Sequence, residues 1–100
     1  MGISISHGVS STRSATTIAN LGQHLAHTFN SGEWREVVEL FGGGFADSVS
    51  IPPRQAGRIG VLLHRAARHR LMLADWGDLA VVIGNAASAA ERAGENWEWS

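Results

Sequence analysis

Hydrophobic and polar residues alternate in three short stretches of the chain, at residues 3–6, 48–51 and 96–99. A period of two puts successive side chains on opposite faces of a strand. We therefore predict three strands that form one small sheet with a core-facing side and a polar side. The residues predicted to face the core are Ile3, Ile5, Val49, Ile51, Trp97 and Trp99.

Between these strands, four stretches repeat hydrophobic residues at intervals of three and four, the spacing that gives one apolar stripe along an α-helix. The first two cover residues 14–29 and 34–41, the third begins after the "IPP" segment, and the fourth ends at Gly94. Ser31 and Asp75 are the expected N-caps of the second and fourth helices. Gly22 lies on the apolar side of the first helix and would let a neighbouring element approach closely.

Together these elements predict a single domain over residues 1–100. The predicted fold class is α+β, with a small three-stranded sheet and four helices packed on one face of it, in the order β-α-α-β-α-α-β.

The third predicted helix has a basic face. Residues 54–72 hold five arginines, two histidines and no acidic residue. At about 100° per residue, one side of this helix carries Arg54, Arg58, Val61, Arg65 and Arg68. This arginine face is either the solvated side of an amphipathic helix, or a binding surface for phosphates or for an acidic protein.

The charge balance favours a protein partner over nucleic acid for the arginine face. The formal net charge is −1, so no overall field attracts DNA or RNA. The arginine face also lacks interleaved aromatic residues on which bases could stack. Glu33, Glu36 and Glu39 offer counter-charges, either within the chain or from a second copy. We expect a homo-oligomer or an acidic protein partner. No membrane partner is expected, because no apolar run approaches the roughly 18 residues of a membrane span.

A second candidate site is the loop at residues 7–14, which leads from a predicted strand into a predicted helix. Free backbone N–H groups at a helix start attract anions. The side chains that would join them are His7, Ser10, Ser11, Thr12 and Arg13. Simple capping of the helix by serine or threonine is the alternative, and the spacing matches neither a phosphate loop nor a dinucleotide-binding motif.

Catalytic and metal-binding motifs are missing from the sequence. There is no cysteine, which excludes disulfides, zinc–thiolate sites and cysteine nucleophiles. His24 and His27 share a helix face at a spacing that can bind zinc, but no third ligand is evident nearby. No serine stands in a recognisable arrangement with a histidine and an acid. We therefore expect no catalytic residues, metal or cofactor, with an active site assembled only in three dimensions as the open alternative.

Three segments, "LGQHLAH", "IPPRQAGRIGVLLHRAARHRLM" and the terminal "WEWS", resemble a family of small actinobacterial proteins classed as a domain of unknown function. The lysine-free composition fits such a source. The resemblance implies a stand-alone domain without an assigned activity, cofactor or catalytic residue, so no residue role carries over.

These observations lead to a functional hypothesis. We expect a small non-enzymatic interaction or regulatory module that self-associates through the arginine face. The alternatives are nucleic-acid binding through the same face, and small-anion binding at residues 7–13. The first eight residues lack the basic and hydrophobic regions of a signal peptide, so a cytoplasmic location is expected.

Overall fold

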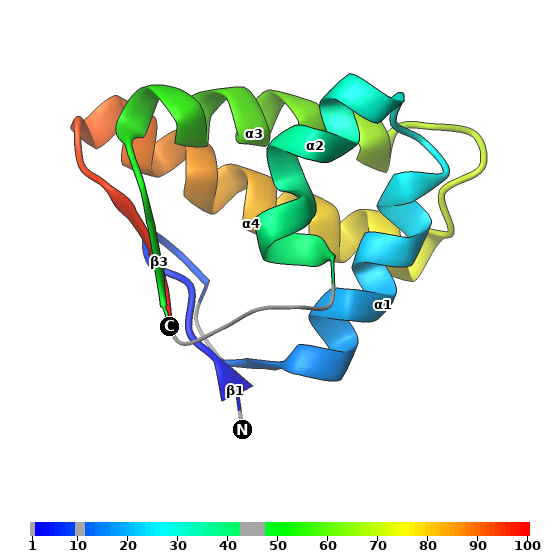
Figure 1. The fold of residues 1–100 in the computed structure, drawn as a ribbon, viewed down its shortest axis with the longest axis horizontal. Coiled ribbons are helices and arrows are strands. Elements are labelled where there is room, and N and C mark those ends of the chain that lie inside the picture. The colour runs from blue at the N-terminus through cyan, green and yellow to red at the C-terminus, as the bar shows by residue number, and fades with distance from the viewer. Residues whose placement is uncertain (1, 10–11, 43–47) are drawn as a thin grey trace.

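The computed structural model describes residues 2–9, 12–42 and 48–100. The described residues form four helices and four short strands in the order β-β-α-α-β-α-α-β (Figure 1). The elements are β1 (Gly2–Ile3), β2 (Arg13–Ser14), α1 (Ala15–Ala26), α2 (Ser31–Phe41), β3 (Val49–Ile51), α3 (Pro53–Ala67), α4 (Ala74–Ala93) and β4 (Trp97–Trp99).

The α+β class is confirmed, but the single three-stranded sheet is wrong. Within the described ranges there are two antiparallel sheets of two strands each, β1 with β2 and β3 with β4. The chain turns sharply at residues 6–8, where His7 and Gly8 have φ angles of 67° and 123°. After this turn, residues 13–14 return to pair with residues 2–3. A two-residue partner strand is too short to leave an alternating pattern, so the sequence did not indicate β2.

The segment after β1 nevertheless lies against the last strand. Ile5 forms an isolated antiparallel bridge with Trp99. The Ser4 N–H donates to the Ser100 carbonyl at 2.7 Å, and the Ser100 N–H donates to the Ser4 carbonyl at 2.9 Å. Residues near the two ends of the chain are therefore bonded to each other.

The predicted alternation of buried and exposed side chains is confirmed. Ser4, Ser50 and Glu98 are exposed, and Val49 is half-buried beside Trp99. The buried members of the predicted core-facing set are Ile3, Ile5, Ile51, Trp97 and Trp99. The helices cover these side chains, so the two tryptophans are part of the core.

The N-caps of two helices differ from prediction. Asn30, not Ser31, caps α2: its side chain accepts a hydrogen bond from the Glu33 N–H while the Glu33 carboxylate accepts one from the Asn30 N–H, which is a capping box. The N-cap of α4 is Leu73, and Asp75 lies in the first helical turn, where a negative charge suits the helix dipole. As predicted, α4 ends at Gly94, in the left-handed conformation with φ of 68°.

Small residues allow α3 and α4 to pack closely as an antiparallel pair. Cβ atoms built on Gly57, Gly77 and Gly84 would meet the side chain of Glu91, the carbonyl oxygen of Ala67 and the ring of His64, respectively. On its other side, α3 contacts α2, so it lies between two helices (Figure 1). None of the helices in the described part of the chain is long and apolar enough to cross a membrane.

Candidate functional site

The two neighbours of α3 divide its polar face into three rows. Arg58 and Arg65 face α2, and His64 faces α4. Between them runs a row of residues spaced by seven, which places them in line along the helix. We call this row the α3 ridge; it consists of Arg54, Val61 and Arg68.

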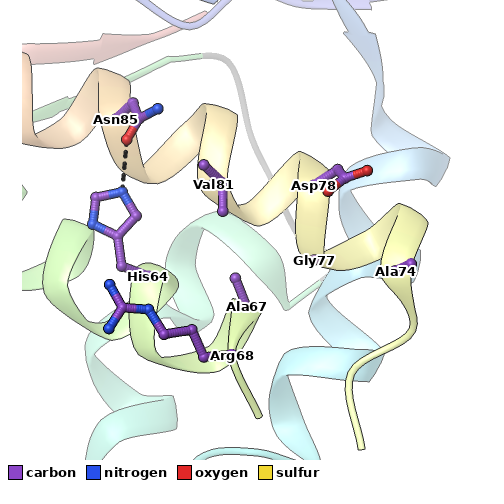
Figure 2. Close-up of a pocket in the computed structure, with 8 residues that line it drawn as sticks. All are labelled: His64, Ala67, Arg68, Ala74, Gly77, Asp78, Val81 and Asn85. Carbon is purple, nitrogen blue, oxygen red and sulfur yellow. Dashed lines mark hydrogen bonds between the residues drawn. The ribbon is translucent and has the colours of Figure 1, made fainter. Parts of the chain in front are cut away.

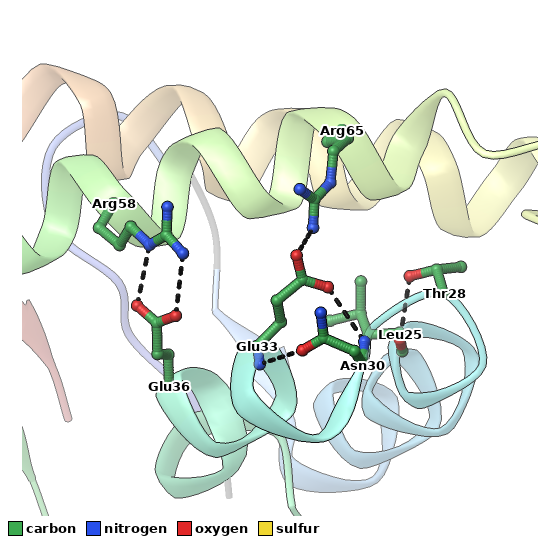
Figure 3. Close-up of polar contacts among 7 residues, drawn as sticks. All are labelled: Leu25, Thr28, Asn30, Glu33, Glu36, Arg58 and Arg65. Carbon is green, nitrogen blue, oxygen red and sulfur yellow. Dashed lines mark hydrogen bonds and ion pairs between the residues drawn. The ribbon is translucent and has the colours of Figure 1, made fainter.

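Glutamates of α2 neutralise the two arginines that face it (Figure 3). Arg58 holds Glu36 in a two-point contact, with Nε donating to Oε1 at 3.0 Å and Nη2 donating to Oε2 at 3.2 Å. The hydrogen bond to Glu36 raises the pKa of Arg58 above its usual range. Arg65 donates to Oε2 of Glu33, whose other oxygen belongs to the capping box of α2. The arginine face is therefore partly an internal contact between α3 and α2.

This arrangement predicts an acid-sensitive contribution of Glu33 to stability. The hydrogen bond from the Asn30 backbone and the one from Arg65 hold the pKa of Glu33 below its ordinary value. A carboxyl with a lowered pKa stabilises the fold above its ordinary pKa, and this stabilisation is lost as the pH falls through the folded-state pKa. Glu33→Gln should therefore lower the melting temperature at pH 7, and the difference from wild type should shrink below the ordinary pKa of about 4.3.

Thermal unfolding of both proteins between pH 7 and pH 3 checks this prediction. The matched control is Glu39→Gln, in the same helix but without an ion pair among the described residues. A Glu33→Gln difference that stays constant over the whole pH range would contradict the prediction.

The ridge itself is open to solvent. Val61 is 60% exposed, and Arg54 and Arg68 are exposed without an ion pair in the described part of the chain. The five residues predicted for partner binding thus fall into two groups. Arg54, Val61 and Arg68 form the exposed ridge, whereas Arg58 and Arg65 are bonded to α2. Partner binding by these residues stays a prediction.

A groove of about 440 Å³ lies beside the ridge, between the second half of α3 and the first half of α4 (Figure 2). Ala67, Gly77 and Val81 provide small and apolar lining. His64 and Arg68 lie at one end and Asp78 at the other (Figure 2). A neighbouring hollow of about 320 Å³ shares His64 and Arg68 with the groove and extends it to Val61.

His64 is oriented by α4 across this groove. Its Nε2 lies 2.8 Å from Oδ1 of Asn85, and because this amide oxygen is an acceptor, Nε2 carries the hydrogen. Asp78 and Asn85 were not among the predicted site residues. In the sequence, the only feature that links these two residues is that they share the polar side of α4. The sequence does not show which side of α4 meets α3, because that depends on the glycines that pack between the two helices.

The predicted anion-binding loop is only partly described. Ser10 and Ser11 lie outside the described residues. Thr12 is exposed, and Arg13 lies in β2. Ser14 caps α1 through its side chain, which accepts from the Thr17 N–H at 3.0 Å. His7 is bonded to Glu95, close to the start of β4, whereas Thr12 and Arg13 lie just before α1. Anion binding by this loop stays a prediction.

His7 lies in a chain of hydrogen bonds that the sequence analysis missed. The Ser6 Oγ lies 2.7 Å from His7 Nδ1, and His7 Nε2 lies 2.9 Å from Oε1 of Glu95. Ser6 and His7 are separated from Glu95 by most of the sequence. The pairing of residues 4–6 with the last strand brings Ser6 and His7 close to Glu95. These three residues could therefore have been predicted as neighbours only from the register of that pairing.

His24, one of the two histidines whose spacing alone would allow zinc binding, contacts an aromatic ring. The ring of His24 stacks on Trp76 of α4, with centroids 5.1 Å apart and planes inclined by 29°. In the described ranges, no three acidic or histidine side chains are grouped so that they could hold a metal ion.

Comparison with known proteins places the chain in a family. A family model described as a domain of unknown function (DUF7739) matches residues 6–100. The chain belongs to this family. The DUF7739 match confirms the resemblance to a domain of unknown function, and it covers the α3 ridge, the groove, His7 and the two buried tryptophans. Neither the curated proteins nor the solved structures contain a match to the chain.

Proposed function

We propose that the protein is an interaction module that self-associates through the α3 ridge and the adjoining groove. The observation that carries this proposal is that one surface holds both an exposed apolar side chain, Val61, and a groove with small and apolar lining next to it. Apolar anchors that fill pockets at the centre of an interface supply most of the binding energy of many complexes.

The charge distribution supports a second copy as the occupant. A two-fold interface brings the same patch of both subunits together, so the patch must complement itself. The groove is basic at the His64 and Arg68 end and acidic at the Asp78 end (Figure 2). A copy rotated by 180° would set the basic end of one groove over the acidic end of the other, and the Val61 side chains would face the apolar lining.

The ion pairs with α2 weigh against nucleic acid as the partner. Affinity for nucleic acid depends on how many phosphates the protein neutralises. Arg58 and Arg65 already neutralise Glu36 and Glu33, which leaves Arg54 and Arg68 of the predicted face for phosphates. The proposal also includes a cytoplasmic location. It includes an origin in a GC-rich actinobacterial genome as well, and the lysine-free sequence supports that origin.

Val61→Asp is expected to convert a dimer to a monomer at micromolar concentration while the monomer stays folded. Burying an unpaired carboxylate in an apolar contact is costly, whereas the isolated subunit leaves the same side chain in water. Sedimentation equilibrium measures the result. Val38→Asp is the matched control, because Val38 is also an exposed valine, 40% accessible, on α2.

A charge exchange tests the orientation of the two copies. Arg68→Asp alone should weaken the dimer, and Arg68→Asp combined with Asp78→Arg should restore it. A wild-type chain that stays monomeric at all concentrations would contradict the proposed self-association. Tight binding of duplex DNA or RNA that weakens steeply with salt would support the nucleic-acid alternative instead.

A further inference from the structure

Ser6, His7 and Glu95 are arranged like a nucleophile, a base and an orienting acid. A carboxylate only accepts hydrogen bonds, so the 2.9 Å contact with Glu95 is made by a hydrogen on Nε2 of His7, and in the neutral ring this tautomer leaves Nδ1 without a hydrogen. Nδ1 is then an acceptor, and the Ser6 hydroxyl donates to it across 2.7 Å. Both distances fall within the range of about 2.6–3.2 Å typical of activated nucleophiles.

Ser6 is held in place by three further hydrogen bonds from the last strand. Its N–H donates to the Glu98 carbonyl, and its Oγ accepts from the Glu98 N–H, each at 2.9 Å. Its carbonyl accepts from Nε1 of the buried Trp97 at 3.2 Å. A nucleophile positioned by a rigid strand loses little entropy when it reacts.

His7 has a strained backbone for a non-glycine residue, with φ of 67°. Such left-handed residues cost free energy and persist where the surrounding structure holds them, often at functional sites. Here the left-handed turn lets the ring of His7 contact the hydroxyl of the preceding residue and the carboxylate of Glu95.

The cluster is also accessible. The His7 side chain is 19% exposed, and Ser6 is half-buried. A Cβ atom built on the adjacent Gly8 would meet no atom of the described residues within 4 Å.

We propose that Ser6 is a nucleophile that hydrolyses esters, with His7 as the general base and Glu95 as its positioning residue. The Ser6 Oγ would attack the ester carbonyl carbon and pass its proton to His7 Nδ1. His7 would return that proton to the alkoxide as the carbon–oxygen bond of the leaving group breaks. Water would then attack the acyl-serine, give a proton to Nδ1 and release the acid, and Ser6 would regain its proton from His7.

Glu95 supports both steps by its charge and its hydrogen bond. It fixes the His7 tautomer that leaves Nδ1 free, and its carboxylate stabilises the imidazolium that forms during each step. This activity is independent of self-association through α3. The competing interpretation is a purely structural contact between the turn at residues 6–8 and the start of β4.

Hydrolysis of p-nitrophenyl acetate by the intact chain tests the proposal. Ser6→Ala and His7→Asn should both reduce the rate to the same background, roughly 10²-fold below wild type. Asparagine tolerates a positive φ, so His7→Asn removes the base without forcing the turn to change. Ser50→Ala is the matched control, because the hydroxyl of Ser50 donates directly to a carboxylate, that of Glu98, and not to a histidine.

A second measurement is needed in case Ser6→Ala does not fold. The wild-type chain is treated with a fluorophosphonate, which labels reactive serines, and mass spectrometry identifies the labelled residue. An adduct on Ser6 that is slower to form in Glu95→Gln supports the proposal. No adduct, or labelling spread equally over Ser50 and other serines, would overturn it. Folded Ser6→Ala with the wild-type hydrolysis rate would overturn it as well.

Discussion

Removal of residues 96–100 is expected to unfold the domain. This segment contains β4, which pairs with β3 on one side and with residues 4–6 on the other. Trp97 and Trp99 are both 0% exposed. Trp99 packs edge-on against Trp97 and Phe41, at centroid distances of 5.3 and 5.4 Å. Truncation of one large aromatic side chain in a core costs about 3–5 kcal/mol. Loss of two such side chains is comparable with the whole stability of a small domain, about 5–15 kcal/mol.

Circular dichroism during thermal unfolding measures this effect. The matched control is Glu98→Ala, because Glu98 lies between the two tryptophans in the same strand but its side chain is exposed. The control should melt cooperatively within a few degrees of wild type, whereas the truncated chain should show no cooperative transition. A truncated chain with the wild-type melting temperature would mean that the tryptophans are not part of the core, and would make them candidates for partner contact.

The core was predictable from the sequence because burial leaves a periodic signal. The alternation around Ile3, Ile51 and the two tryptophans identified the buried strand faces correctly. The pairing of the strands was not predictable to the same degree. It depends on a turn at His7 and Gly8, whose positive φ angles have no periodic signature, and on β2, which has only two residues.

The candidate sites, like the core, were predictable where a local pattern indicated them and not where they depend on contacts between distant elements. The helical spacing of Arg54, Val61 and Arg68 was enough to predict that they share a face. The pairing of Arg58 and Arg65 with α2 depends on how α2 crosses α3, and the sequence offered Glu33 and Glu36 only as candidate counter-charges. The contact between His7 and Glu95 depends on strand register alone, which explains why no local pattern indicated it.

Gly22→Ala is expected to be strongly destabilising, although alanine is the better helix former. A Cβ atom at this position would lie 1.9 Å from the carbonyl oxygen and 2.9 Å from the carbonyl carbon of Phe41, at the end of α2. These are backbone atoms and cannot rotate away as a side chain would. Phe41 is itself buried against Trp99, so α2 cannot retreat without opening the core.

Overpacking of this kind costs about 1–3 kcal/mol and occasionally more, and the contact at Gly22 places the expected loss at the upper end. Urea-induced unfolding gives the free energy of unfolding for comparison. The matched control is Gly32→Ala in the first turn of α2, where the new Cβ would lie 3.4 Å from Oδ1 of Asn30, an ordinary contact. There the gain in helix propensity, up to about 1 kcal/mol, should leave the protein as stable as wild type or more so. Equal stability of the two variants would mean that α1 and α2 do not meet at Gly22, and that the close approach of these helices is not required for the fold.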